Sequence, residues 1–281
     1  MLPDELRGRL AALLGEPLGQ AVAVGGGDIS RAARVRAHGA DWLVKWRPGA
    51  PDDFFAAEAD GLERLRAAGS LPVPEVLAHA AEFIVIEWFD DRGRYDPADL
   101  GAGLAALHGH GAPRYGYERD NFIGALPQPN AWTDGWPAFW RDQRLLPQIR
   151  LADRAGHIRG SRARGLDRLC ARLDALLDHR PAPALLHGDL WAGNVIAAPD
   201  GRPALIDPAV SYGDRETDLA FAALFGGFGP AFFTAYQAAG PTPPGAAERR
   251  PLYQLYWLLV HLTLFGESYG AAVDAVTQRY I

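Results

Sequence analysis

Three polar residues near the middle of the sequence have the types and the spacing that phosphoryl transfer uses. Two apolar residues at 185–186 lead into His187-Gly188-Asp189, Asn194 comes five positions after Asp189, and Asp207 follows a second apolar segment. In kinase-type phosphoryl transfer, an Asp accepts the hydroxyl proton, an Asn five residues on holds metal, and a later Asp also holds metal. Carboxylate and amide oxygens suit Mg²⁺, which is usually held through one or two protein ligands plus substrate phosphates. We therefore predict Asp189 as the general base and Asn194 and Asp207 as Mg²⁺ ligands.

A hairpin must bring these residues together. Val195–Ala198 and Arg202–Ile206 are predicted as two short strands around a turn at 199–201. In that turn, a proline presets φ and a glycine allows positive φ. Folding about the turn places Asn194 opposite Asp207, at the open end of the hairpin. The alternative is a polar surface hairpin without chemistry, in which the residue types, their order and the geometry would coincide by chance.

Two departures from protein kinases narrow the prediction. His187-Gly188-Asp189 stands where protein kinases have His-Arg-Asp, and Asp207 is followed by Pro-Ala where they have Phe-Gly. Without that arginine, the usual partner of a phosphorylated activation loop is missing. The pattern therefore favours a permanently assembled kinase for small molecules over a switched protein kinase.

The sequence also carries three longer motifs: HGDLWAGN at 187–194, LIDPAVSYGDRETDLA at 205–220 and DNFIGALPQPN at 120–130. With these motifs the chain resembles the fructosamine kinase (ketosamine-3-kinase) family, within the wider aminoglycoside-phosphotransferase-like group, from about Val24 to the C-terminus. The resemblance implies ATP and Mg²⁺ as cofactors and the 3-hydroxyl of a ketosamine as acceptor. The partner would be a small ketosamine or a glycated amine or protein, and the reaction would serve deglycation.

The expected fold class is α+β, a bilobal protein-kinase-like fold. We expect a small lobe with an antiparallel sheet over residues 1–89 and a mostly helical large lobe over residues 90–281. ATP and Mg²⁺ should bind between the lobes.

One basic residue stands apart in the composition. The chain contains 27 Arg and a single Lys, Lys45, on a predicted strand over Trp42–Trp46. Because a compact ammonium is not equivalent to a planar guanidinium, Lys45 is predicted to hold ATP phosphates. Glu58, on the helix that follows, is predicted to pair with it, with Asp60 and Glu63 as rivals. The alternative is that Lys45 is a chance survivor of codon drift.

Two further segments of the small lobe are predicted to bind the nucleotide. Three glycines, Gly25-Gly26-Gly27, followed by Ser30 allow backbone N–H groups to approach a phosphate, although a simple hairpin turn is the alternative. The backbone of Glu87-Trp88-Phe89 is predicted as the hinge that meets the adenine edge.

Three residues of the large lobe are predicted to border the acceptor. Trp191 either packs on the sugar face or belongs to the core, Asp214 either caps a helix or contacts a cationic substrate group, and Asn121 borders the cleft. Two other residues are predicted as structural. Asp218 resembles the carboxylate that accepts N–H bonds from the catalytic loop in kinase-like folds, and His108 should be a satisfied core histidine.

Composition excludes several other functions. The net charge is −6 without a basic stripe, which argues against nucleic-acid binding. No segment is typical of a signal peptide or a bilayer span, so we expect a cytoplasmic enzyme that binds no membrane. The single cysteine, Cys170, excludes an intramolecular disulfide and is predicted as an inert packed thiol. The oligomeric state stays open.

Two alternative functions are weighed against ketosamine phosphorylation. The first is a kinase for another small hydroxylated acceptor of the aminoglycoside, choline or homoserine type, which the HGDLW and DPA motifs disfavour. The second is a non-catalytic nucleotide-binding module. Such a module would have lost at least one of Lys45, Asp189, Asn194 or Asp207, and the sequence retains all four.

Overall fold

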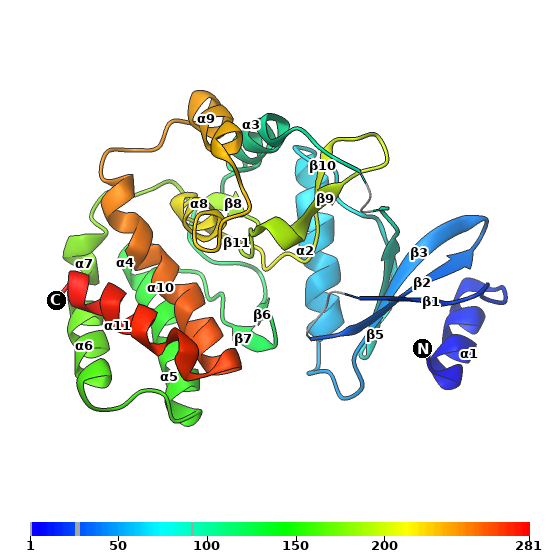
Figure 1. The fold of residues 1–281 in the computed structure, drawn as a ribbon, viewed down its shortest axis with the longest axis horizontal. Helices are drawn as coiled ribbons and strands as arrows, with labels where there is room; N and C mark the ends of the chain where they lie inside the picture. The colour runs from blue at the N-terminus through cyan, green and yellow to red at the C-terminus, as the bar shows by residue number, and fades with distance from the viewer. Residues whose placement is uncertain (1, 26–28, 91–92) are drawn as a thin grey trace.

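The computed structural model describes residues 2–25, 29–90 and 93–281. Its N-terminal part is built on an antiparallel sheet with strand order β1-β2-β3-β5-β4, together with two helices (Figure 1). These elements are α1 (Asp4–Leu14), β1 (Val22–Val24), β2 (Arg31–Ala37), β3 (Ala40–Trp46), α2 (Phe54–Ala68), β4 (Val76–Ala80) and β5 (Phe83–Glu87). The predicted strands and helices of this part are confirmed.

Helices cover both faces of this sheet, which explains why β5 is a nearly continuous apolar run. Successive strand residues point to opposite faces. Phe83 and Val85 pack with leucines of the α1 segment on one face. Ile84 and Ile86 pack with the apolar residues of α2 on the other face. The sheet and α2 therefore form a firm support for the side chains at the end of β3.

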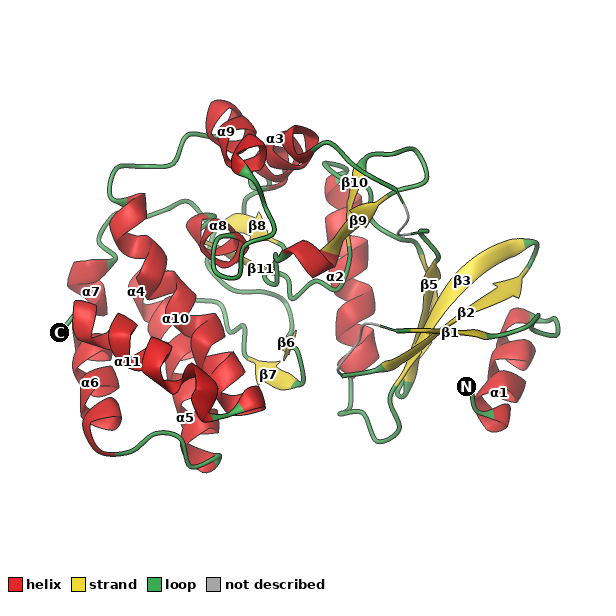
Figure 2. Ribbon diagram, in the orientation of Figure 1, coloured by secondary structure: helices red, strands yellow, loops and turns green. Residues whose placement is uncertain are grey.

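The C-terminal part is mostly helical, as predicted (Figure 2). Its helices are α3 (Pro97–Leu107), α4 (Trp136–Phe139), the π-helical η1 (Trp140–Leu145), α5 (Leu146–Arg154), α6 (Gly160–Ala171), α7 (Leu173–Leu176), α8 (Glu216–Ala222), α9 (Pro230–Ala239), α10 (Ala246–Phe265), the 3₁₀ turn η3 (Glu267–Tyr269) and α11 (Gly270–Arg279). Together they bury the largest aromatic side chains of the protein.

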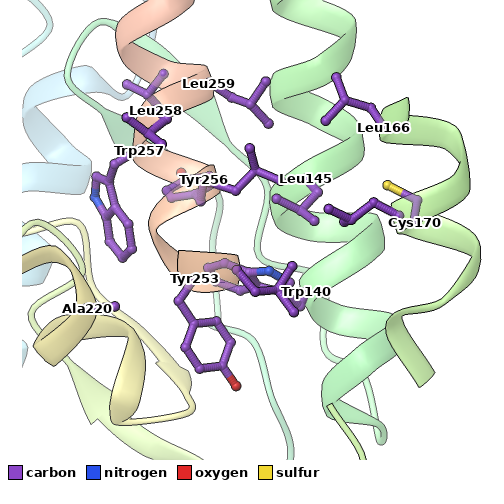
Figure 3. Close-up of a cluster of buried hydrophobic side chains, with 14 of the residues drawn as sticks. Trp140, Leu145, Leu166, Cys170, Ala220, Tyr253, Tyr256, Trp257, Leu258 and Leu259 are labelled. Carbon is purple, nitrogen blue, oxygen red and sulfur yellow. The ribbon is translucent and has the colours of Figure 1, made fainter. Parts of the chain in front are cut away.

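Helix α10 is the centre of this helical part. Tyr253, Tyr256 and Leu259 on α10 face Trp140 and Leu145, which come from η1 (Figure 3). Cys170 of α6 lies at the edge of the same cluster, where it is buried. The apolar run at 252–265 forms the C-terminal part of α10 and is mostly buried. Within the described ranges, no helix combines the length and the apolar character that a bilayer span requires.

Short strand pairs between the helices carry the polar residues of interest. β8 (Ala184–Leu186) pairs with β11 (Ser211–Gly213), β6 (Asn121–Ile123) with β7 (Leu126–Gln128), and β9 (Val195–Ala197) with β10 (Pro203–Leu205). In the β9–β10 hairpin, Val195 lies opposite Leu205, and the Ile206 N–H donates to the Asn194 carbonyl at 3.1 Å. The predicted hairpin is thus confirmed.

Candidate active site

A sharp turn after β8 presents Asp189. Gly188 in this turn has a φ of 81°, in the left-handed region that favours glycine. A Cβ on residue 188 would lie 2.0 Å from the carbonyl oxygen of Ala209. The two backbone segments therefore approach too closely for any side chain at position 188. This contact explains why a glycine stands where protein kinases carry an arginine.

The carboxylate of Asp218 holds this turn from the interior. Its oxygens accept the N–H groups of His187 at 2.8 Å and of Gly188 at 2.9 Å. His108 lies 3.1 Å from the same carboxylate through Nε2 and 2.8 Å from the Tyr236 hydroxyl through Nδ1. Burial opposes ionisation of Asp218, but the hydrogen bond and charge of His108 keep its pKa below the ordinary value. The structural roles predicted for Asp218 and His108 are confirmed.

His187 links the catalytic turn to the segment that carries Asp207. Its Nδ1 accepts the Asp189 N–H at 3.2 Å, so its proton sits on Nε2, which donates to the Ile206 carbonyl at 2.9 Å. Burial lowers the pKa of His187, which keeps the imidazole neutral in this role. No role for His187 could be predicted from the sequence alone.

Asp189 and Asn194 meet across the short 3₁₀ turn η2 (Ala192–Asn194). The Asn194 side-chain amide donates to the Asp189 carboxylate at 2.9 Å and to its backbone carbonyl at 2.8 Å. Burial raises the pKa of Asp189 to about 7, and the negative charges of Asp207 and Asp218 act in the same direction. A carboxylate with such a pKa can take up a proton near neutral pH.

Asp207 follows β10 in an unusual backbone conformation. Its φ is 54°, in the left-handed region that few residues other than glycine adopt. Its side chain is 45% exposed and forms a close ion pair with the Lys45 ammonium. Such backbone conformations persist only where the surroundings enforce them, and they gather at functional sites. The surroundings of Asp207 therefore hold its backbone in this conformation and direct its side chain toward Lys45.

Lys45 of β3 and Glu58 of α2 form the ion pair that the sequence predicts. The Lys45 Nζ lies 2.7 Å from the Glu58 Oε1, and the two side chains are only 13% and 15% exposed. Burial by itself lowers the pKa of Lys45, but the charges of Asp207 and Glu58 outweigh burial and raise it. The two alternative partners of Lys45, Asp60 and Glu63, do not pair with it. Asp60 accepts from the Tyr117 hydroxyl at 2.7 Å, and Glu63 is exposed.

The structure describes only part of the predicted phosphate loop. Gly26 and Gly27 lie outside the described residues, whereas Gly25 is exposed and Ser30 is half-buried at the start of β2. A methyl group built on Gly124, in the β6–β7 turn, would lie 3.2 Å from the side chain of Ile29. The end of the loop thus approaches the helical part of the molecule.

The hinge prediction can be refined by the backbone hydrogen bonds. The Glu87 N–H donates to the Glu75 carbonyl at 2.8 Å, and the Trp88 N–H donates to the Asp41 carbonyl at 3.3 Å. These two donors are therefore already engaged. Among the described residues, no backbone partner is found for the Phe89 N–H.

Trp191 is placed at the surface beside the catalytic turn. Its side chain is 43% exposed, and its N–H donates to the Asp189 carbonyl at 3.1 Å. A Cβ on Gly193 would lie 2.3 Å from the indole, so the ring covers this glycine. The alternative that Trp191 belongs to the core is wrong, because a core residue would be enclosed on all sides.

Asp214 and Asn121 lie in the interior. Asp214 is 2% exposed and accepts from the Glu216 N–H at 3.0 Å, from the Tyr253 hydroxyl at 2.6 Å and from His179 at 2.7 Å. The bond from the Glu216 N–H favours a capping role at the start of α8, although the N-cap position itself is Arg215, and the other two contacts join Asp214 to Tyr253 and His179 inside the protein.

Asn121 borders an open hollow of about 480 Å³. The hollow is lined by residues 52–53, just before α2, by residues 119–120, and by residues of the β6–β7 hairpin. The side-chain atoms of Asn121 are nevertheless all engaged within the protein: Asn121 donates to the Val210 carbonyl at 2.9 Å and accepts from Gln128 at 2.8 Å and Asn130 at 2.9 Å. We therefore assign Asn121 to the internal packing and not to substrate contact. The neighbours Gln128 and Asn130 were not singled out in the sequence, although both belong to the motif at 120–130.

The residues present fit a divalent metal. Asp207 offers a carboxylate and Asn194 an amide oxygen, and the Asn194 amide nitrogen lies 3.5 Å from the Asp207 backbone carbonyl. The Asn194 nitrogen is the atom that bonds Asp189, so its oxygen stays available as a ligand. Two protein oxygens completed by phosphates and water are the donor set that Mg²⁺ prefers.

Comparison with known proteins identifies the family of the chain. A family model described as fructosamine kinase matches residues 8–281. A protein of Enterococcus faecium named "Probable ketoamine kinase" is 40% identical, and the alignment covers 93% of this chain and 95% of that protein. A protein of the same name from Lactiplantibacillus plantarum is 39% identical, with 92% of each chain covered.

Solved structures agree with the sequence comparison. A crystal structure of a candidate fructosamine-3-kinase from Thermobifida fusca is 34% identical, with a TM-score of 0.90 over 99% of both chains. An aminoglycoside phosphotransferase in complex with AMP-PNP and hygromycin B is 17% identical, with a TM-score of 0.65 over 98% of both chains. At this identity, the second likeness shows the fold alone, which is that of the kinase-like phosphotransferases.

Proposed function

Because the chain belongs to the fructosamine kinase family, we propose that it transfers the γ-phosphoryl group of ATP to the 3-hydroxyl of a ketosamine. The chain is a kinase, and its fold family implies the use of ATP. The observation that carries the proposal is the meeting of the Lys45–Glu58 pair with Asp207 and with the Asp189–Asn194 pair. Phosphoryl transfer to a hydroxyl needs these groups together. The product would shed its sugar, which makes the activity a deglycation.

Asp189 is the proposed catalytic base. Asn194 holds one of its carboxylate oxygens at 2.9 Å, which leaves the other to face a substrate hydroxyl. Asp189 accepts the proton of that hydroxyl as the oxygen attacks the γ-phosphorus and the bond to the β-phosphate oxygen breaks. His187 and Asp218 hold the turn, so the carboxylate meets the acceptor with little reorganisation.

Lys45, Asp207 and Asn194 are proposed to hold the phosphates and the metal. When bound, Mg²⁺ neutralises charge that develops on the transferring phosphoryl group. Asp207 and Asn194 would supply its protein ligands, and the Lys45 ammonium would contact the phosphates while Glu58 orients it. Gly25, Gly26, Gly27 and Ser30 would cover the phosphates, and the Phe89 N–H and the hinge carbonyls would receive the adenine. We propose the lobe boundary at this hinge, between residues 89 and 90.

Trp191 is the proposed wall for the sugar. Its exposed indole stands two residues from the base, and apolar ring faces commonly stack on sugars in this way. The alternatives with aminoglycoside, choline or homoserine acceptors are not favoured, because relatives at 39–40% identity are named as ketoamine kinases.

Acceptor-dependent turnover of ATP tests the proposal. ADP release should rise with lysine adducts of ribulose, erythrulose or fructose, and NMR of the product should place the phosphate on O3. Asp189→Asn should retain ATP binding and lose about 10²- to 10⁴-fold in rate, as expected for a general base. Equal activity on an aminoglycoside, choline or homoserine would contradict the proposed acceptor, and absence of turnover with every acceptor would favour a non-catalytic module.

A further inference from the structure

Three buried side-chain amides form a hydrogen-bonded group beside the segment that carries Asp207. Asn121, Gln128 and Asn130 come from the β6–β7 hairpin and its flank, and each is at most 5% exposed. All three belong to the motif at 120–130, to which the proposed function assigns no role. We call these residues, together with Arg144 and Tyr256, the amide relay.

The relay ends on two backbone carbonyls just after Asp207. The Asn121 amide donates to the Val210 carbonyl at 2.9 Å, and the Gln128 amide donates to the Ala209 carbonyl at 3.2 Å. Within the relay, the amides of Gln128 and Asn130 both donate to the Asn121 oxygen, at 2.8 and 2.9 Å. The segment after Asp207 is therefore held by side chains from another part of the chain.

The Arg144 guanidinium fixes the direction of the hydrogen bonds that run through Asn130 and Asn121 to the Val210 carbonyl. The Arg144 guanidinium donates to the Asn130 amide oxygen at 2.8 Å, and the Tyr256 hydroxyl donates to the Gln128 amide oxygen at 2.6 Å. A guanidinium cannot accept a hydrogen bond. Asn130 must therefore turn its oxygen to Arg144 and its nitrogen to Asn121, and Asn121 must in turn direct its own nitrogen to Val210.

Burial of the Arg144 guanidinium at this position costs free energy. The guanidinium is buried between the rings of Phe139 and Tyr256, and its acceptors are all uncharged oxygens, including Ser211 Oγ at 2.9 Å. Burial lowers the pKa of Arg144 to about 10; the charge of Asp120 acts in the opposite direction, but no described carboxylate forms an ion pair with Arg144. A buried charge without a counter-charge opposes stability. The hydrogen bonds of the guanidinium to four uncharged oxygens offset part of that cost and tie Arg144 to Asn130 and to Ser211.

We propose that the amide relay is the positioning device for the metal segment 207–210, and that Asn121, Gln128 and Asn130 are positioning residues. Asp207 keeps its left-handed backbone because the two carbonyls that follow it are clamped. The Ala209 N–H donates to the His187 carbonyl at 2.9 Å, so the same clamp aligns Asp207 with the turn that carries Asp189. The inference rests on the proposed role of Asp207 as a metal ligand.

The variant Asn121→Asp tests the relay with almost no change of shape. The new carboxylate still accepts from Gln128 and Asn130, but it sets an oxygen against the Val210 carbonyl in place of a donor. Gln143→Glu is the matched control. It makes the same change of charge at the neighbour of Arg144, where the side-chain oxygen only accepts from the Ala131 N–H. Tyr256→Phe is a second, milder variant that removes one relay donor and serves if Asn121→Asp does not fold.

Hydrogen exchange of the protein without metal or nucleotide is the first readout. Amides at 207–213 should exchange about tenfold faster in Asn121→Asp, as expected for the loss of one buried hydrogen bond, while those of α10 stay unchanged. The Mg²⁺-dependent part of ATP binding, measured by calorimetry, should weaken by about tenfold, and ATP binding without Mg²⁺ should not change. Tyr256→Phe should shift both readouts in the same direction, and Gln143→Glu neither.

Two outcomes would overturn the relay. The first is wild-type exchange at 207–213 together with wild-type Mg²⁺ dependence in the variants. The second is uniformly faster exchange across the helical part with unchanged Mg²⁺ dependence, which would make the amides merely structural. Asp207→Ala separates this inference from the proposed function. If Asp207→Ala retains Mg²⁺-dependent ATP binding, the proposed metal ligand is wrong, and the local exchange at 207–213 still decides whether the relay positions the segment.

Discussion

Gly188→Ala should disable the enzyme, because the added methyl group meets backbone that cannot yield. The new Cβ would stand 2.0 Å from the Ala209 carbonyl oxygen, roughly 1 Å or more inside van der Waals contact. That carbonyl accepts from Gln128, and the Ala209 N–H donates to His187 at 2.9 Å, so the segment is held on both sides. Relief of the clash must therefore move the turn of Asp189 away from the segment of Asp207.

Two contributions set the expected loss of stability in Gly188→Ala. An alanine at a φ of 81° costs about 1–2 kcal/mol, and forcing an extra methyl group into packed structure costs a further ~1–3 kcal/mol. We expect the free energy of unfolding to fall by about 2–5 kcal/mol. A displacement of about 1 Å between the base and the phosphate-binding groups can lower the rate about 10²-fold, so we expect that loss in kcat.

Gly201→Ala is the matched control for this prediction. Gly201 has a φ of 83°, but no atom lies within 4 Å of a Cβ built there. The control should therefore lose only about 1–2 kcal/mol of stability and no activity. Urea unfolding and ketosamine-dependent ADP release measure the two quantities. A kcat for Gly188→Ala within about threefold of wild type, or equal losses in both variants, would refute the clash argument.

Three further predictions address single groups. Lys45→Arg should fold but lose about tenfold or more in kcat/KM, because a guanidinium does not fit between Glu58 and Asp207. An amine-reactive acyl phosphate of ATP should label Lys45 in the wild-type protein unless ATP protects it. A fully active Lys45→Arg variant would contradict the proposed role of Lys45. Asp207→Ala should weaken ATP binding only when Mg²⁺ is present, so unchanged Mg²⁺ dependence in calorimetry would remove Asp207 as a ligand. Burial raises the pKa of Cys170 to about 11, so its thiol stays protonated until the pH rises through that value. Alkylation at pH 8 should then be about 100-fold slower in the native protein than in urea, and equal rates would show an accessible thiol.

The sequence by itself predicted the hairpin and the order of the phosphoryl-transfer residues. Asp189, Asn194 and Asp207 lie within one short stretch of chain, and the turn at 199–201 has the residue types that fix a hairpin. Lys45 could be singled out from composition alone, as the one lysine among 27 arginines. These features are local, and local turn chemistry and residue type are the properties that a sequence displays directly.

Only the tertiary structure decided which distant groups meet. The contact of Lys45 with Asp207 joins residues 162 positions apart, and Glu58 prevails over Asp60 because Tyr117 engages the latter. Asn121 was predicted to border the cleft, and a substrate contact was one of two alternatives for Asp214. Both proved to be interior residues whose polar atoms are engaged by other parts of the chain. A polar side chain is available to a ligand only if no buried partner already holds it, and burial of that kind depends on packing between segments that no local pattern records.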